Sequence, residues 1–320
     1  MSAVPADTTS ARAAGGPAAA ALGMVGLGRM GWGMTQRIRE NGLRVVGYDR
    51  HPEHTDVGSL AELVGALPAP RAVWVMLPAG VPTQSTLDEL LGLLAAGDVV
   101  VEGGNSNFRD SIARARTFAE RGIGYVDAGV SGGVWGLAEG FCLMVGGTAA
   151  DVATVRPFLD ALAPEGGLVH AGESGAGHFA KMVHNGIEYG LMQAYAEGYE
   201  LMAATDLDID VPATFAAWRN GSVVRSWLLD LMVRALAEDP KLERVRGWAD
   251  DSGEGRWTVD EAIKAAVPLH VISAALFARF ASRQDESIAM KVIATLRNQF
   301  GGHAVLPETA TGETKRDVAE

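Results

Sequence analysis

Four polar side chains between positions 181 and 188 have the types and the spacing that proton transfer to and from a substrate needs. They are Lys181, His184, Asn185 and Glu188. Offsets of three, four and seven residues place all four along one face of an α-helix. A lysine held neutral by burial or by a nearby cation can accept a proton from a substrate hydroxyl, and a glutamate on the following turns can return a proton to carbon. The spacing therefore predicts an acid–base pair of Lys181 and Glu188.

The other interpretation of this stripe is a solvent-exposed helix surface, but such surfaces usually carry repeated Glu–Lys pairs. The flanking residues also favour a site. Gly172, Gly175 and Gly177 allow another backbone to approach the start of the helix. Apolar residues on the remaining faces would pack against the protein: Met182, Val183, Ile187 and Leu191.

A glycine-rich turn, Gly26-Leu27-Gly28-Arg29-Met30-Gly31, follows an apolar run and opens a helical pattern. Gly26 allows a tight turn, Gly28 lets the backbone approach a pyrophosphate, and Gly31 allows close packing of helix on strand. The N–H groups at the start of the helix then face the anion. Asp49 ends the next apolar run, eighteen positions after Gly31, where an acidic residue accepts hydrogen bonds from the adenosine ribose. Together these features predict a dinucleotide site rather than a purely structural turn.

The charge of Asp49 favours NAD, because it repels the 2′-phosphate of NADP. Arg50 and His51 follow immediately and could contact that phosphate, so the use of NADP stays open. The expected cofactor-binding residues are Gly26, Leu27, Gly28, Arg29, Met30, Gly31, Asp49, Arg50, Leu77 and Asn105.

Two further glycine-rich segments follow predicted strands, and both carry polar side chains. They are Glu102-Gly103-Gly104-Asn105-Ser106 and Asp127-Ala128-Gly129-Val130-Ser131-Gly132-Gly133. Each alone could be an ordinary turn. Two such loops at strand ends of one dinucleotide-binding domain favour a site for a polyol or a carboxylate.

Short apolar runs alternate with helical patterns from residue 22 to about residue 172. Runs rich in Val, Leu and Met are typical of strands buried on both faces, so the sheet should be largely parallel and covered by helices. The expected strands are 22–27, 44–48, 72–77, 98–102, 125–128 and 142–145. After Gly177 the strand signals vanish, and the helical patterns include 178–204, 213–218, 224–237, 259–266 and 287–297. The predicted fold is an α/β Rossmann-type doubly wound parallel sheet domain followed by an all-α carboxy-terminal domain.

The predicted division is a disordered tail over 1–20, a dinucleotide-binding domain over 21–176, a helical substrate and dimerisation domain over 177–303, and a polar tail over 304–320. The net charge of −12 argues against nucleic-acid binding, and no apolar stretch is long enough to span a membrane. The single cysteine, Cys142, excludes an internal disulfide, offers no metal cluster and suits a reducing cytoplasm.

These motifs resemble those of 6-phosphogluconate dehydrogenases, and the resemblance runs from about Leu22 to His303. Its carriers are Gly26–Gly31, Gly103–Ser106, Val130–Gly133, Lys181–Tyr189 and Arg297–His303, of which Lys181–Tyr189 is the most specific. The resemblance implies oxidative decarboxylation of 6-phosphogluconate to ribulose 5-phosphate, the reaction of the pentose phosphate pathway. Lys181 would then be the base at the C3 hydroxyl while hydride passes to the nicotinamide. Loss of carbon dioxide leaves an enediol, which Glu188 would protonate at C1.

The resemblance also implies how the substrate is bound. Residues that would hold its carboxylate and hydroxyls are Asn105, Ser131, Gly132, Gly133, His184 and Asn185. Residues that would surround its phosphate are Tyr189, Arg279, Arg297 and His303, with Arg283 as an additional contact. Such a cluster could overcome the repulsion of a phosphate by the net negative charge. In the family the tail segment reaches a neighbouring subunit, so a homodimer or homotetramer is expected.

The sequence departs from longer family members in the loop before a Trp-Thr pair. Those enzymes carry lysines there, whereas this chain has Asp251-Ser252-Gly253-Glu254-Gly255-Arg256. The loop offers acids and a single arginine, which leaves its role at the phosphate open. Trp135 follows the Ser-Gly-Gly turn where longer members are more polar, and it could line the cofactor site. The helical domain is also much shorter, so a duplicated helical extension is missing.

Two other functions compete with this interpretation. A non-decarboxylating β-hydroxyacid dehydrogenase of the 3-hydroxyisobutyrate type would share the glycine-rich turn, the Ser-Gly-Gly loop and the lysine, but it would not need His184 with Glu188 or the Arg297–His303 pair. A non-catalytic NAD-sensing module would have no use for a paired base and acid. Measurable turnover distinguishes the sensor from the enzymes.

Overall fold

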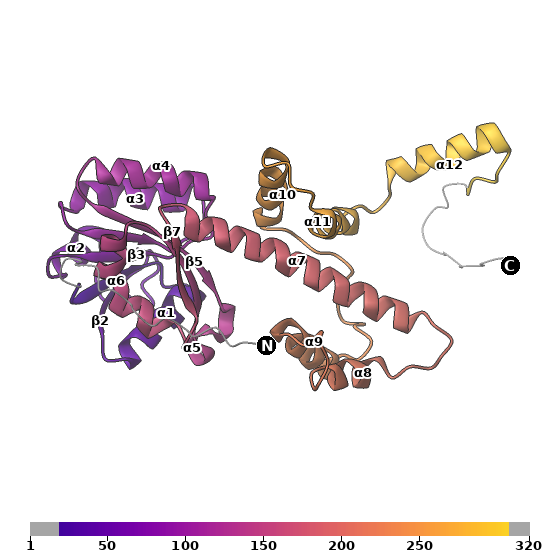
Figure 1. Ribbon diagram of the computed structural model, residues 1–320, viewed down its shortest axis with the longest axis horizontal. Coiled ribbons are helices and arrows are strands. Elements are labelled where there is room, and N and C mark those ends of the chain that lie inside the picture. Colours follow the sequence, from indigo (N-terminus) through magenta and orange to yellow (C-terminus); the bar gives the residue numbers. More distant parts are fainter. Residues whose placement is uncertain (1–18, 307–320) are drawn as a thin grey trace, which may run out of the picture. The chain divides into compact units, whose positions relative to one another are not determined.

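The computed structural model describes residues 19–306, and its first part is built on one seven-stranded sheet (Figure 1). The strands are β1 (Ala21–Val25), β2 (Arg44–Tyr48), β3 (Ala72–Val75), β4 (Val99–Glu102), β5 (Gly124–Ser131), β6 (Cys142–Gly146) and β7 (Leu168–Gly172). They lie in the order β2-β1-β3-β4-β5-β6-β7. All neighbouring pairs are parallel except β5 with β6, which run antiparallel. This confirms the predicted doubly wound, largely parallel sheet.

Helices cover both faces of the sheet because the side chains of the central strands alternate between two cores. In β1, Leu22 and Met24 pack with α1 (Arg29–Glu40) and α6 (Ala149–Leu162). Ala21 and Val25 of the same strand pack on the other face, with α2 (Leu60–Gly65), α3 (Val81–Leu93) and α4 (Phe108–Ala119). Successive residues of a strand point to opposite faces, so a continuously apolar strand serves two cores at once.

The rest of the described chain is helical, as predicted. A short 3₁₀ turn (Gly133–Trp135) and α5 (Gly136–Glu139) connect β5 to β6. After β7 come α7 (Ala176–Ala203), α8 (Val211–Trp218), α9 (Trp227–Glu238), α10 (Glu254–Lys264), α11 (His270–Ser282) and α12 (Ile288–Gly301). None of the helices among residues 19–306 combines the length and the apolarity that crossing a membrane requires.

The chain forms two compact units that do not follow the predicted boundary at residue 177. The first unit ends at Met192, within α7, and regains residues Gly253–Ile272, which include α10. The second unit holds Gln193–Ser252 and the chain from Ser273 onward, with a core of Val211, Phe215, Leu229 and Leu236. The difference arises because the first half of α7 packs on β5, and α10 joins the same unit through contacts with α7, with α4 and with Asn105.

Several predicted elements differ from those observed. Strand β5 extends to Ser131, where the sequence predicts a loop from Asp127, because its second half pairs with β6. Strand β7 was not predicted, since its side chains are largely exposed and lack the apolar pattern of a buried strand. Of the predicted amino-terminal tail, Ala19 is 5% exposed and belongs to the core. Residues 1–18 and 307–320, which include most of both predicted tails, lie outside the described residues.

Candidate active site

The glycine-rich turn joins β1 to α1 in the geometry that a dinucleotide site needs. Gly26 has φ +92°, a conformation that favours glycine. A Cβ on Gly31 would lie 1.9 Å from the carbonyl oxygen of Gly26, so only glycine lets the helix approach the turn this closely. At Gly28, by contrast, a Cβ would meet nothing within 4 Å. The turn therefore leaves open space beside Gly28, where the backbone can approach a pyrophosphate.

Asp49 is held by hydrogen bonds to both of its carboxylate oxygens, one from this turn and one from the chain that follows Asp49. Its Oδ2 accepts a hydrogen bond of 2.6 Å from the backbone N–H of Leu27, and its Oδ1 accepts one of 3.0 Å from that of His51. Leu77 lies on the other side, because a Cβ on Gly26 would approach its side chain to 2.8 Å. Of the predicted cofactor residues, the structure thus brings the turn, Asp49 and Leu77 together. Arg50 is exposed next to Asp49.

These residues lie where the chain order of the sheet reverses. Strand β1 is flanked by β2 and β3, and the turns at the carboxyl ends of β1 and β3 meet there. In open α/β sheets the ligand binds in the crevice at such a switch point. The turn, Asp49 and Leu77 therefore fit a dinucleotide.

Helix α7 is fixed to the sheet by glycines and by one buried aspartate. A Cβ on Gly129 of β5 would lie 2.4 Å from the Cβ of Lys181, and a Cβ on Gly177 would lie 2.5 Å from the carbonyl oxygen of Asp127. The fully buried carboxylate of Asp127 accepts hydrogen bonds from the N–H groups of Gly175 (2.6 Å) and His178 (2.8 Å). A side chain from β5 thus satisfies N–H groups at the start of α7 that have no partner within the helix.

The predicted stripe on α7 converges on the ring of His184. Its Nδ1 lies 3.3 Å from the Nζ of Lys181, 3.3 Å from the Oδ1 of Asn185 and 3.7 Å from the Oε2 of Glu188. On the other side of the ring, Nε2 lies 3.4 Å from the Oγ of Ser131, at the end of β5. The structure therefore brings together the lysine, histidine, amide, carboxylate and hydroxyl side chains that the sequence selects, and their catalytic roles stay a prediction. Gly132 (φ +137°) and Gly133 (φ +53°) turn the chain directly after Ser131.

Burial lowers the pKa values of the two basic groups of this stripe, Lys181 and His184. Lys181 is 8% exposed, and desolvation is the main reason that its pKa is lowered, opposed by the charges of Glu188, Glu254 and Cys142. Desolvation also lowers the pKa of His184, with the charge of Lys181 acting in the same direction. A buried lysine with a lowered pKa can work as a base, and a neutral histidine can accept or donate one hydrogen bond at each side of its ring.

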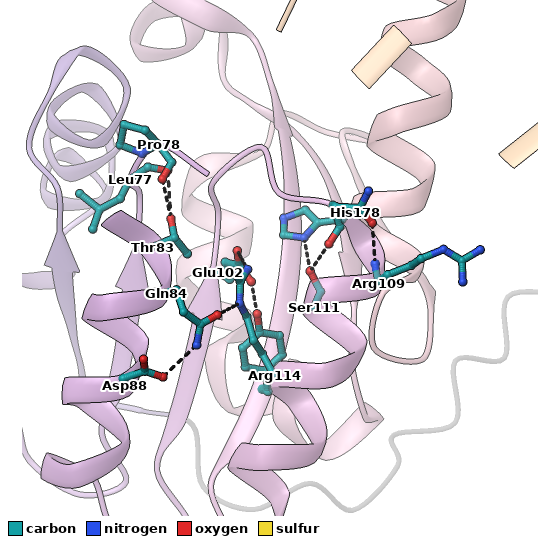
Figure 2. A network of polar contacts seen from close by, with 12 residues as sticks. Leu77, Pro78, Thr83, Gln84, Asp88, Glu102, Arg109, Ser111, Arg114 and His178 are labelled. Atoms are coloured by element: carbon teal, nitrogen blue, oxygen red, sulfur yellow. Dashed lines mark hydrogen bonds and ion pairs between the residues drawn. The ribbon is translucent and has the colours of Figure 1, made fainter. Parts of the chain in front are cut away.

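The Gly103–Ser106 loop is anchored by a buried ion pair at the end of β4 (Figure 2). Glu102 is fully buried and accepts hydrogen bonds from the Nη1 of Arg114 (2.6 Å) and from the hydroxyl of Tyr125. Arg114 also donates from Nε to the Oε1 of Gln84, at 2.9 Å, which links α4 to α3. The buried carboxylate thereby sets the position from which the next residues, up to Asn105, leave the sheet.

Asn105 contacts a residue that the sequence analysis did not select. Its Nδ2 donates a hydrogen bond to the Oε1 of Glu254, the first residue of α10. Glu254 is only 2% exposed. One signal was present, an acid in the loop where longer family members carry lysines, but nothing in the spacing indicated that residue 254 returns to residue 105.

The predicted phosphate ligands are divided between the two units. Tyr189, 6% exposed, continues the α7 stripe in the first unit. In the second unit Arg279 donates to the carbonyl oxygen of Asp250 (2.8 Å), and Arg283 forms ion pairs with Asp250 (2.7 Å) and Asp251 (2.9 Å). Arg297 lies on α12 and His303 follows it. Their convergence on a phosphate stays a prediction.

Comparison with protein families gives two consecutive matches. The NAD binding domain of 6-phosphogluconate dehydrogenase matches residues 21–172, and the C-terminal domain of 6-phosphogluconate dehydrogenase matches residues 177–315. A Haloferax volcanii protein named 6-phosphogluconate dehydrogenase, NAD(+)-dependent, decarboxylating is 42% identical over 296 residues, which cover 89% of this chain and 98% of that protein.

Two solved structures share the architecture. Plasmodium falciparum 6-phosphogluconate dehydrogenase matches with a TM-score of 0.76 and 27% identity, over 90% of this chain and 67% of that one. Mycobacterium tuberculosis 3-hydroxyisobutyrate dehydrogenase matches with a TM-score of 0.66 over 87% of this chain and 99% of that one, but at 23% identity this likeness concerns the fold alone. The family matches over both parts of the chain, and the 42% identity over nearly all of a relative's length, show that this chain belongs to the 6-phosphogluconate dehydrogenase family.

Proposed function

We propose that the chain oxidises and decarboxylates 6-phosphogluconate to ribulose 5-phosphate and carbon dioxide, with NAD as the preferred acceptor. The observation that carries this proposal is the cluster on α7, in which the buried Lys181 lies together with the partly exposed His184 and Glu188, beside Ser131 at the end of β5. A base and an acid on one helix face suit a reaction that removes one proton and later delivers another.

Lys181 takes the first step in this proposal. Its neutral amine accepts the proton of the C3 hydroxyl. A bound nicotinamide would supply the acceptor for the hydride that leaves C3. The ammonium that Lys181 then carries sits beside the new carbonyl oxygen, where it stabilises the negative charge that develops when the C1–C2 bond breaks. Carbon dioxide leaves and its bonding electrons pass into the enediol. Glu188 gives a proton to the former C2, which becomes C1 of ribulose 5-phosphate.

Polar side chains around the pair would orient the substrate. Its carboxylate and hydroxyls would find hydrogen-bond donors and acceptors on Ser131, His184, Asn185 and Asn105. Gly132 and Gly133 have no side chains that would occupy the space of the substrate. For the phosphate we retain Tyr189, Arg279, Arg283, Arg297 and His303 as the proposed ligands.

A homodimer or homotetramer would supply the last of these ligands from a second copy. Helix α12, which carries Arg297, contains no buried residue, and Leu296 and Phe300 are 55% and 79% exposed. An apolar surface of this kind is typical of a protein interface. The single Cys142 fits a reducing cytoplasm as the site of action.

The preference for NAD rests on Asp49. Its carboxylate is fixed beside Gly26–Gly31 by the N–H groups of Leu27 and His51, so its charge faces the position where NADP would place a phosphate. The NAD(+)-dependent name of the Haloferax volcanii relative supports the same preference.

Replacement of Asp49 by serine should move the enzyme away from NAD. A hydrogen bond to a charged group is worth about 1.5–3 kcal/mol, so kcat/KM with NAD should fall roughly tenfold to a hundredfold. With NADP, kcat/KM should stay the same or rise, because serine does not repel the 2′-phosphate. The ratio of the two kcat/KM values is the measurement, and Glu53→Ser, an exposed acid on the same loop, is the control. An unchanged ratio in Asp49→Ser would contradict the assignment.

The pH profile should show Lys181 as the base. The neutral amine is the active form, so kcat/KM should rise with pH through the pKa of Lys181, and burial places that rise below the ordinary lysine value of 10.5. His184, whose pKa is lowered from 6.5, stays neutral across this range. This rise of kcat/KM with pH, the acid limb of the profile, should therefore persist in His184→Asn. Its disappearance in that variant would show that histidine, not lysine, titrates.

Substrate preference separates this function from its nearest rival. We expect kcat/KM for 6-phosphogluconate to exceed the values for gluconate and for 3-hydroxyisobutyrate by orders of magnitude, since only the first offers a phosphate. Preference for an unphosphorylated hydroxy acid would replace the proposal with a β-hydroxyacid dehydrogenase. Binding of NAD without turnover of any of the three would favour a sensor.

A further inference from the structure

Glu254 stands out as an acid at a site built for an anionic substrate. It opens α10, and its side chain is almost completely buried, at 2% exposure. Burying a carboxylate is unfavourable unless it is hydrogen-bonded or paired with positive charge. The longer-family pattern would place lysines in this loop, so Glu254 needs a role of its own.

Helix α10 is held firmly against the elements that carry the site. The hydroxyl of Thr258 lies 2.9 Å from the carbonyl oxygen of Met182 on α7 and 2.8 Å from that of Glu254. A Cβ on Gly186 would approach the Cγ2 of Thr258 to 2.8 Å, so α7 and α10 touch at a glycine. Arg109 of α4 binds both carboxylate oxygens of Glu261, at 3.1 and 2.6 Å. These contacts fix Glu254 relative to the α7 stripe.

The contact between Glu254 and Asn105 determines which way the Asn105 amide faces. An ionised carboxylate only accepts hydrogen bonds, so it must receive the NH₂ group of the amide. The Oδ1 of Asn105 consequently points away from Glu254. It can then accept a hydrogen bond from a hydroxyl group, whereas a freely rotating amide would present a donor as readily as an acceptor.

Glu254 also acts on Lys181 by charge. The charged or titratable groups that face Lys181 are His184 and Glu188 on α7, Cys142 on β6 and Glu254 on α10. Burial lowers the pKa of Lys181, and the charges of Glu188, Glu254 and Cys142 act against that lowering. Glu254 lies in the first turn of α10, where the helix dipole stabilises its negative charge.

We propose that Glu254 is a positioning residue, which orients Asn105 as an acceptor for a substrate hydroxyl and balances the ammonium form of Lys181 before substrate binds. The inference rests on the proposed function, because it assigns Asn105 and Lys181 their roles in that reaction. It also gives the acidic loop a task that requires no contact with the phosphate.

Glu254→Gln tests both parts. The amide of glutamine can face Asn105 with either end, so the orientation is lost, and KM for 6-phosphogluconate should rise about tenfold or more. Removal of the negative charge should also shift the acid limb of kcat/KM to lower pH, because the ammonium of Lys181 loses a stabilising neighbour. Glu254→Asp keeps the negative charge, but its side chain is one methylene shorter and does not reach Asn105 in the same way. This variant should raise KM without shifting the acid limb.

Two further variants complete the design. In Asn105→Ala the additional change Glu254→Gln should leave KM unaltered while still moving the acid limb, since the amide to be oriented is gone. Glu261→Gln removes a charge from α10 about two turns away from Glu254, while Thr258 still holds the helix to Met182 of α7, so it should keep both the wild-type KM and the wild-type pH profile. A thermal melt of each variant establishes that it is folded.

The outcomes distinguish this inference from the function on which it rests. Wild-type turnover of 6-phosphogluconate together with a folded Glu254→Gln of unchanged KM and unchanged pH profile would overturn the role of Glu254 alone. If Glu254→Gln does not fold, Glu254→Asp decides by its KM. A wild-type protein that does not oxidise 6-phosphogluconate removes the proposed function, and the inference with it.

Discussion

Lys181→Met should lower kcat by roughly 10²–10⁴-fold, the usual contribution of a general base. Methionine matches the length of the lysine stem and carries no charge, so it should fill the same buried space between α7 and Gly129 without loss of stability. Both the hydride step and the stabilisation of the developing enediol oxygen depend on this nitrogen. The measurement is the single-turnover rate of nicotinamide reduction with saturating 6-phosphogluconate.

Two controls make the result specific. Lys181→Arg keeps the charge but cannot deprotonate, because the guanidinium stays protonated at any pH the enzyme tolerates, so it should be nearly as slow as the methionine variant. Lys264→Met removes an exposed lysine whose partner is Glu261 and should behave as wild type. A single-turnover rate in Lys181→Met within a few-fold of wild type would remove Lys181 from the chemistry.

Glu102→Leu should destabilise the protein by about 3–5 kcal/mol, since it leaves a buried arginine without its charge partner. Arg114 is 7% exposed and Glu102 is fully buried, so water cannot replace the lost interaction. The hydroxyl of Tyr125 loses its acceptor in the same variant. Equilibrium unfolding in urea measures the change in the free energy of unfolding.

The exposed ion pair between Arg109 and Glu261 provides the matched control. Arg109 is 53% exposed, and Glu261→Gln should cost less than about 1 kcal/mol. The double variant Glu102→Leu with Arg114→Met should recover part of the lost stability, because no unpaired charge then remains buried. Equal losses in the free energy of unfolding for Glu102→Leu and Glu261→Gln would show that the buried ion pair contributes no more to stability than the pair between Arg109 and Glu261.

The parts of the site that the sequence predicted are those whose geometry is local. Lys181 and Glu188 share a helix face because seven residues make nearly two turns, whatever the helix packs against. Gly26, Gly28 and Gly31 likewise act within one strand–turn–helix unit, where Gly26 has a positive φ and Gly31 packs closely on the turn.

The parts that were missed depend on contacts between residues far apart in the chain. Glu254 meets Asn105 across 149 residues, and no periodicity in the sequence records such a contact. The antiparallel pairing of β5 with β6 extends β5 to Ser131 for the same reason. Strand β7 lies at the edge of the sheet, where side chains need not be apolar, so its pattern does not differ from that of a loop.

In the proposed reaction, one cluster on α7 couples oxidation to decarboxylation. Its most direct test is to give the purified protein 6-phosphogluconate and NAD, and to measure the reduced nicotinamide and the carbon dioxide formed in the same samples. We expect equal molar amounts of the two, together with ribulose 5-phosphate. Reduced nicotinamide without carbon dioxide, or reaction only with unphosphorylated hydroxy acids, would contradict it.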